Sequence, residues 1–151
     1  MSGNRLTDLF TVTGQSPWLD NLKREYIVNG DFARVLASGI RGLTSNPTIF
    51  QKAIQGSALY DDQFFKSVQR GLTTEETYWE LVVSDIIGAL DIFGPLYVSS
   101  SGLDGYVSVE VSPGLAQDMD GTVAAAQELQ DRIARPNVMI KVPATKVCIP
   151  A

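Results

Sequence analysis

The sequence predicts an α/β fold in which helices alternate with the strands of a parallel sheet. Four short apolar runs are typical of strands, and segments with helical spacing of apolar residues separate them, so the expected order is β-α-β-α-β-α-β. Strands joined through a helix are normally parallel, with right-handed crossovers. With 44% hydrophobic and 19% charged residues among 151, the chain has the composition of one globular unit with a buried core.

The first predicted elements are short. A helical lead-in over residues 4–10 precedes a brief apolar run, 18–20, which ends in Asp20 and which we interpret as a strand. Residues 21–37 then place apolar side chains at mostly helical spacing, although Asn29-Gly30 weakens the middle of the segment. We therefore expect a strand followed by a helix that is weak at its centre.

A second strand, predicted over residues 40–44, leads into a helix whose start is well marked. Asn46 precedes Pro47, and asparagine is a favoured N-cap while proline suits the first helical position. Helical patterns then occupy residues 48–55, 58–70 and 74–93. The last pattern opens with acids in its first turn, and Gly94-Pro95 is expected to weaken or end it.

The last two predicted strands are the clearest. Residues 106–111 alternate strictly between valine and polar or aromatic side chains, and residues 138–142 follow an alanine-rich helix over 119–134. If the valines face a helix layer, Glu110 and Lys141 point into the same interior near the carboxyl ends of their strands. In a barrel, catalytic residues lie at that end.

Composition argues against several classes of function. The chain has no histidine, which removes the commonest general base and metal ligand and, with them, serine–histidine and cysteine–histidine hydrolase chemistry. Its single cysteine, Cys148, excludes an intrachain disulfide, makes a thiolate metal cluster implausible and fits a reducing, cytoplasmic compartment. A net charge of −5 without a basic stretch argues against nucleic-acid and anionic-membrane partners.

Segments that would direct the chain to or across a membrane are not expected. No basic and apolar signal opens the sequence, and by inspection no apolar run approaches the roughly 18 residues that a spanning helix needs. We therefore expect a chain that is neither secreted nor embedded.

Lys141 is the residue that most strongly indicates a chemistry. A lysine in the middle of an apolar strand loses hydration, which favours the neutral amine, and a neutral amine attacks carbonyl groups. The alternative is a lysine that extends from the strand end to solvent. Glu110 could form a structural interior ion pair with Lys141, or it could shuttle protons during imine formation and hydrolysis.

The other candidate residues also have simple structural explanations. Asp20, an acid after a short strand, could be a helix N-cap or the base at a substrate hydroxyl in carbon–carbon cleavage. Asn46 is explained by its helix start alone. Thr44 and Ser45 are candidates for substrate binding, but they could equally form the turn after the second strand.

Four stretches of the chain carry a resemblance to a known family. They are Trp18-Leu19-Asp20-Asn21, Gly42-Leu43-Thr44-Ser45-Asn46-Pro47-Thr48-Ile49-Phe50, Asp104-Gly105-Tyr106-Val107-Ser108-Val109-Glu110-Val111-Ser112-Pro113 and Met139-Ile140-Lys141-Val142-Pro143-Ala144-Thr145. In these stretches, and in this order, the chain resembles the transaldolases, especially a bacterial group sometimes fused to phosphoglucose isomerase. The resemblance implies a (β/α)₈ TIM barrel of the class I aldolase type, with no metal and no organic cofactor.

The resemblance also implies roles for individual residues. Lys141 would form a Schiff base with a ketose, Asp20 would exchange the proton of the substrate hydroxyl, and Glu110 would work with a bound water. Asn46 would orient the substrate. The implied reaction transfers a dihydroxyacetone unit from sedoheptulose 7-phosphate to glyceraldehyde 3-phosphate, in the cytoplasmic, non-oxidative pentose phosphate pathway. The implied partners are small sugar phosphates.

The extent of the resemblance bears on activity. It covers the first four β/α units, so we expect one partial barrel domain over 1–151, with the remaining units and their phosphate-binding serine and arginine residues outside this sequence. A parallel sheet with helices on one face leaves the other face exposed, which favours marginal stability or pairing with another copy as a homo-oligomer. Two alternatives stay open: a non-catalytic fragment or assembly module, and a related Schiff-base aldolase that releases the three-carbon unit.

Overall fold

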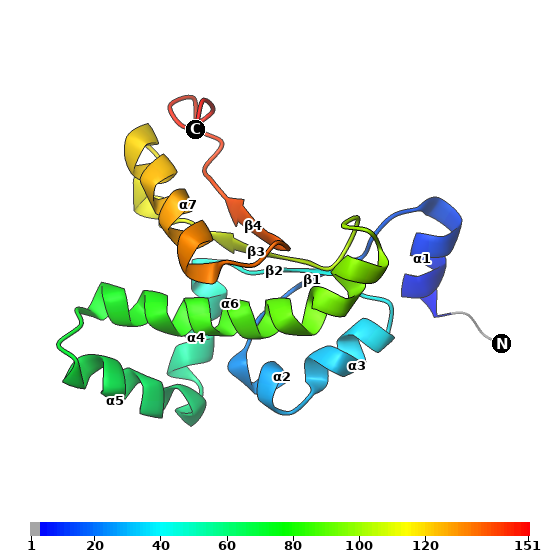
Figure 1. Cartoon of the computed structure of the whole chain (residues 1–151), viewed down its shortest axis with the longest axis horizontal. Coiled ribbons are helices and arrows are strands. Elements are labelled where there is room, and N and C mark those ends of the chain that lie inside the picture. Colours follow the sequence, from blue (N-terminus) through cyan, green and yellow to red (C-terminus); the bar gives the residue numbers. More distant parts are fainter. Residues whose placement is uncertain (1–3) are drawn as a thin grey trace.

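The strands form one parallel sheet. The computed structural model describes residues 4–151. Its strands are β1 (Trp18–Asp20), β2 (Gly42–Thr44), β3 (Tyr106–Glu110) and β4 (Val138–Lys141), hydrogen-bonded in the order β1-β2-β3-β4. All of the pairs are parallel, so sheet order follows chain order (Figure 1). The predicted α/β class is confirmed, and the arrangement is that of part of a TIM barrel.

Helices connect the strands and precede the first one. They are α1 (Arg5–Thr13), α2 (Arg24–Val28), α3 (Asp31–Ala37), α4 (Pro47–Gln55), α5 (Asp61–Gln69), α6 (Thr74–Ser99) and α7 (Met119–Ile133), with short 3₁₀ turns η1 (Ala58–Tyr60) and η2 (Pro113–Leu115). The helix predicted over 21–37 is divided into two at Asn29-Gly30. The reason is that Gly30 adopts φ +80°, a left-handed conformation that ends one helix and precedes the next.

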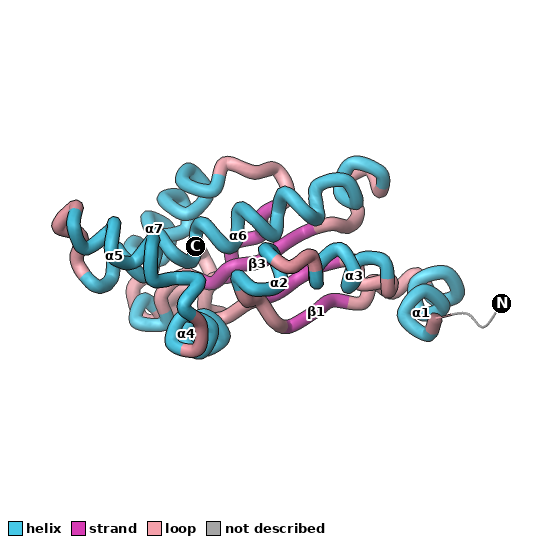
Figure 2. The backbone as a smooth tube through the Cα atoms, turned by 90° about the horizontal axis from the view of Figure 1, so that it is seen from below, coloured by secondary structure: helices cyan, strands magenta, loops and turns pink. Residues whose placement is uncertain are grey.

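The helices cover one face of the sheet. Helices α2, α3 and α6 lie on the same side of the strands, and α7 flanks β3 and β4 (Figures 1 and 2). As predicted, Val107, Val109 and Val111 are buried in the core that this layer forms, together with Phe32, Phe93 and other apolar side chains. The opposite face of the sheet carries exposed groups such as Trp18 and Met139.

Helix α6 is longer than the sequence predicted. Gly94-Pro95 was expected to weaken or end it, but Pro95 lies inside a helix that continues to Ser99. Proline removes one intrahelical hydrogen bond, and packing against β3 compensates because Phe93 is fully buried. Gly105 lies so close to α6 that a Cβ there would be 2.4 Å from the Tyr97 nitrogen. Tertiary packing therefore overrides the local helix-breaking signal.

The same helix corrects the expectation about apolar runs. By length and composition alone, α6 could cross a membrane, since an 18-residue window of it has a mean hydropathy of 1.7. Its apolar residues, however, face the sheet and neighbouring helices: Leu81, Val82, Ile86 and Leu90 are each at most 1% exposed. Helix α6 is thus a partly buried core helix, apolar because it packs against the rest of the fold.

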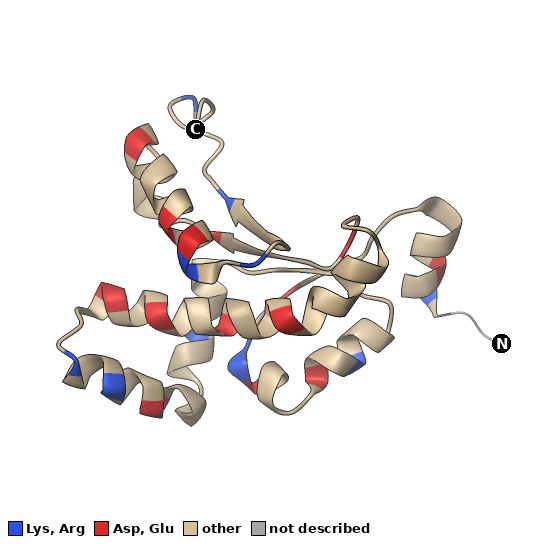
Figure 3. Ribbon diagram, viewed as in Figure 1, with Lys and Arg blue, Asp and Glu red and all other residues tan. Residues whose placement is uncertain are grey.

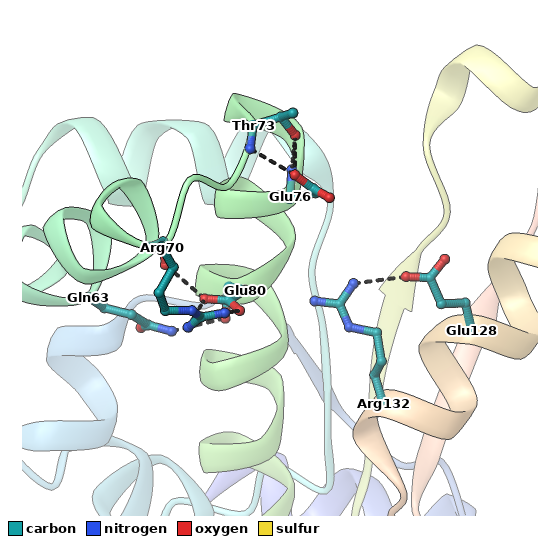
Figure 4. A network of polar contacts seen from close by, with 8 residues as sticks. Gln63, Arg70, Thr73, Glu76, Glu80, Glu128 and Arg132 are labelled. Carbon is teal, nitrogen blue, oxygen red and sulfur yellow. Dashed lines mark hydrogen bonds and ion pairs between the residues drawn. The ribbon is translucent and has the colours of Figure 1, made fainter.

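A capping box begins α6. The Glu76 backbone N–H donates to Thr73 Oγ1 over 3.2 Å, and the Thr73 N–H donates to the Glu76 carboxylate over 2.7 Å (Figure 4). The backbone hydrogen bond from Thr73, and next its side-chain bond, lower the pKa of Glu76. The carboxylate form of Glu76 is therefore part of the helix start.

We expect Thr73→Ala to lower the free energy of unfolding by about 1 kcal/mol, because it removes a cap acceptor. Urea denaturation monitored by circular dichroism would measure the change. The matched control is Thr74→Ala, one residue further, because the Thr74 side chain has no part in the box. Equal losses for the two variants would contradict a specific role for the cap.

Candidate active site

Charged residues are scarce in the strands of the described structure and concentrate on the helices (Figure 3). The three that the strands contain are Asp20, Glu110 and Lys141, and each is the last residue of its strand. Strand β2 ends in Thr44. Because parallel strands place their carboxyl ends at one edge of the sheet, all four strand-final side chains belong to the same edge.

The ammonium group of Lys141 is held by three acceptors. Its Nζ lies 2.5 Å from Glu110 Oε1, 2.9 Å from Thr44 Oγ1 and 3.0 Å from the carbonyl oxygen of Ser45. An ammonium group has three N–H donors, so each donor has a partner. The side chains of Lys141 and Glu110 are 37% and 35% exposed, which leaves the pair accessible to a small molecule. Lys141 is thus bound at the strand ends instead of extending freely into solvent.

Sheet register brings these groups together. Glu110 and Lys141 are direct register partners on β3 and β4, and Thr44 is the partner of Ser108. The Ser108 hydroxyl donates to Thr44 Oγ1 over 2.9 Å, and Ser108 is only 3% exposed. Sequence reasoning did not select Ser108, although its position two residues before Glu110 on the same strand face was a usable signal.

Cavities at this edge of the sheet connect the candidate residues. A cavity of about 730 Å³ is lined by Asp20, Asn46 and Glu110, among others. A second, of about 350 Å³, is lined by Glu110 and Lys141. Glu110 therefore borders both spaces, between the lysine and the exposed Asp20 carboxylate. Helix α2 has Lys23 at its N-cap position without a side-chain cap, so Asp20 does not cap that helix.

The remaining predicted site residues have structural partners. Asn46 caps α4, since its Oδ1 accepts from the Ile49 N–H over 3.0 Å, and it also lines the larger cavity. Ser45 is fully buried, and its hydroxyl donates to the Ser108 carbonyl over 2.9 Å. Its carbonyl, not its hydroxyl, reaches Lys141. Thr44 contacts Lys141 directly through its side chain.

The negative charge of Glu110 affects the pKa of Tyr78, a residue of the helix layer. Burial, and next the charge of Glu110, raise the pKa of Tyr78 to about 12. Tyr78 lies on α6 and stays a neutral phenol at ordinary pH. Among residues 4–151 there is no group of three or more His, Cys, Asp or Glu side chains in position to hold a metal ion. The geometry offers a lysine, carboxylates and hydroxyls, which is a set suited to Schiff-base and proton-transfer chemistry.

Comparisons with known proteins identify the family to which this chain belongs. The family model described as transaldolase/fructose-6-phosphate aldolase matches residues 17–151. The chain is 44% identical to transaldolase 2 of Nostoc punctiforme over 152 aligned positions, which cover 100% of this chain and 40% of that protein.

Two further relatives show the same pattern. The transaldolases of Trichodesmium erythraeum and Neisseria gonorrhoeae are 45% and 46% identical over 91% of this chain, and the matches cover 37% and 39% of their own lengths. The chain thus spans about 40% of the length of the curated relatives it matches. On the extent of the family match and these identities, the chain belongs to the transaldolase/fructose-6-phosphate aldolase family.

Proposed function

We propose that this chain carries the Schiff-base part of a transaldolase active site, with Lys141 as the nucleophile. The observation that carries the proposal is the position of Lys141 Nζ. It lies at the carboxyl edge of a parallel sheet, 2.5 Å from a carboxylate oxygen of Glu110, beside a cavity of about 350 Å³. An amine of this kind attacks carbonyl groups, and the adjacent carboxylate supplies the proton transfers that imine formation needs.

The first half of the proposed reaction forms an imine. One ammonium proton of Lys141 passes to Glu110, directly or through a water, and the freed lone pair attacks the C2 carbonyl of a donor ketose. Proton transfers through Glu110 convert the carbinolamine oxygen to water, which leaves. The product is an iminium ion whose nitrogen withdraws electrons from the neighbouring carbons.

The second half breaks and remakes a carbon–carbon bond. Asp20 accepts the proton of the C4 hydroxyl, the C3–C4 bond breaks, and its electron pair moves into the iminium to give an enamine while the first aldose leaves. The enamine carbon then attacks the carbonyl carbon of an acceptor aldehyde, and Asp20 returns its proton to the aldehyde oxygen. Water hydrolyses the iminium that this step regenerates and releases the new ketose. Asp20 is exposed and lines the larger cavity, so its carboxylate is accessible to such a hydroxyl.

The substrates follow from the relatives. Because the similar proteins are transaldolases, we propose sedoheptulose 7-phosphate and glyceraldehyde 3-phosphate as donor and acceptor, in the cytoplasm, with Asn46 and Thr44 at the substrate-binding edge. Ser45, which the sequence also suggested for substrate binding, is fully buried and supports this edge through its hydrogen bond to the Ser108 carbonyl. We further propose that residues 1–151 belong to one barrel domain of which they form the first four β/α units. The exposed face and edges of such a sheet also support association with another copy.

Borohydride trapping tests the proposal. The chain is incubated with fructose 6-phosphate and reduced, and peptide mass mapping then separates Lys141 from Lys146, an exposed lysine five residues further. We expect an adduct confined to Lys141. The absence of any adduct, under conditions in which a full-length transaldolase labels, would refute the proposal and favour a non-catalytic fragment. Turnover without an aldose acceptor would favour the related aldolase.

A further inference from the structure

We propose that Ser108 is a positioning residue that keeps the lone pair of Lys141 free by fixing the hydroxyl of Thr44. The inference rests on the proposed function, because it concerns the nucleophile of the same site. In the part of the chain that the structure describes, the Ser108 side chain forms no hydrogen bond with Lys141, Glu110 or Asp20. It acts on Lys141 through one intermediary, the side chain of Thr44.

The Thr44 hydroxyl oxygen is shared by two donors. It accepts from Lys141 Nζ over 2.9 Å and from Ser108 Oγ over 2.9 Å. A hydroxyl has two acceptor lone pairs and one proton. With both lone pairs engaged, its own proton is directed away from Lys141 and from Ser108. Ser108 therefore sets the rotation of the Thr44 hydroxyl.

Burial makes this arrangement stable. Ser108 is 3% exposed, so water does not compete well for its hydroxyl. Its backbone carbonyl accepts from the Ser45 hydroxyl, and the Ser45 carbonyl in turn accepts from Lys141. The residues that hold Lys141 on the β2 side are thus tied to β3 through Ser108 by two hydrogen bonds.

The chemical consequence concerns the neutral amine. When Lys141 loses one proton to Glu110, its two remaining N–H groups stay on Thr44 and the Ser45 carbonyl. The lone pair then takes the direction of the lost proton, toward Glu110 and the 350 Å³ cavity. Without Ser108, the Thr44 hydroxyl is free to rotate and donate its proton to the amine, which would occupy the lone pair needed for attack.

The test measures the nucleophilicity of Lys141 without any sugar. The folded chain is labelled with trace acetic anhydride, and mass spectrometry gives the ratio of acetylation at Lys141 to that at Lys146. Ser108→Ala should lower this ratio roughly fivefold, the equivalent of one hydrogen bond. Ser108→Thr, which retains a hydroxyl donor, should keep most of it. Ser67→Ala is the matched control, because Ser67 is fully buried and bonds Glu80 elsewhere in the fold.

A double-mutant cycle distinguishes a role of Ser108 in positioning Thr44 from a general role in stabilising the sheet. If Ser108 acts through Thr44, then adding Ser108→Ala to Thr44→Val should change the ratio no further. An unchanged ratio in Ser108→Ala, or additive effects in the cycle, would overturn the inference. Because the reagent is not a sugar, a missing fructose 6-phosphate adduct with this labelling pattern intact would refute the proposed function alone.

Discussion

Lys141→Arg should lose the trapped fructose 6-phosphate adduct completely while the fold stays intact. A guanidinium group remains protonated at any pH compatible with folding, so it has no lone pair with which to attack a carbonyl. It still offers a positive charge and several N–H donors to Glu110, Thr44 and the Ser45 carbonyl. The variant thus removes the nucleophile but keeps the cation, and mass spectrometry after borohydride reduction measures the loss.

Two companion variants control this experiment. Lys146→Arg makes the same exchange at the neighbouring exposed lysine and should label as the unmodified chain does. Lys141→Ala should also lose the adduct, but it leaves the Glu110 carboxylate without its ion-pair partner. An adduct that persists in Lys141→Arg, for instance at Lys52 beside the larger cavity, would show that the nucleophile is another lysine.

Asp85→Ala should cost about 3–5 kcal/mol of unfolding free energy, because it breaks a buried ion pair on one side only. Asp85 Oδ1 lies 2.7 Å from Arg24 Nε, and their side chains are 2% and 12% exposed. Its second oxygen accepts from the Tyr60 hydroxyl over 2.7 Å. Removing the carboxylate leaves a guanidinium and a phenol hydroxyl without their acceptor inside the fold. Urea denaturation would measure the loss.

The same helix supplies a matched control. Asp91 also lies on α6 and pairs with an arginine, Arg135, at 2.8 Å, but these side chains are 56% and 38% exposed. We expect Asp91→Ala to cost less than about 1 kcal/mol, the usual value of an exposed pair. Equal losses of stability in the two aspartate variants would show that burial does not determine the importance of the Asp85–Arg24 pair.

The stability that Asp85 contributes also depends on pH. Burial raises the pKa of Asp85, while the Tyr60 hydrogen bond and the Arg24 charge oppose that rise. An acid whose pKa is raised on folding binds its proton more tightly in the folded state. The part of its contribution that depends on protonation is therefore fully present below the unfolded value of 3.8 and is lost as the pH rises through the raised pKa.

The strands and their orientation were predictable because alternation is a strong local signal. The valines of β3 had to face one way, so Glu110 faced the other, and the same argument applied to Lys141 on β4. The parallel pairing of the strands was likewise expected from the β-α-β connections. Together these two inferences predict that the side chains of Glu110 and Lys141 share one interior, and in the structure Lys141 Nζ lies 2.5 Å from Glu110 Oε1.

Other features depend on contacts between distant residues, which local sequence patterns do not predict. Arg24 and Asp85 are 61 positions apart in the chain, and nothing near either residue predicts their pairing. The hydroxyls of Ser108, Thr44 and Ser45 are small polar groups without a distinctive period, so their hydrogen bonds emerge only from the register of the sheet. The continuation of α6 through Pro95 likewise depends on packing against β3.

The agreement between sheet order and chain order has a consequence for biosynthesis. A ribosome releases the strands in the order in which they pair, so each new strand meets an edge that is already present. Growth can proceed from the N-terminus without waiting for a later segment to insert between earlier strands. Lys141, on the last of the four strands, emerges after Thr44, Ser45 and Glu110. Vectorial translation thus delivers Lys141 to hydrogen-bonding partners that have already been synthesised.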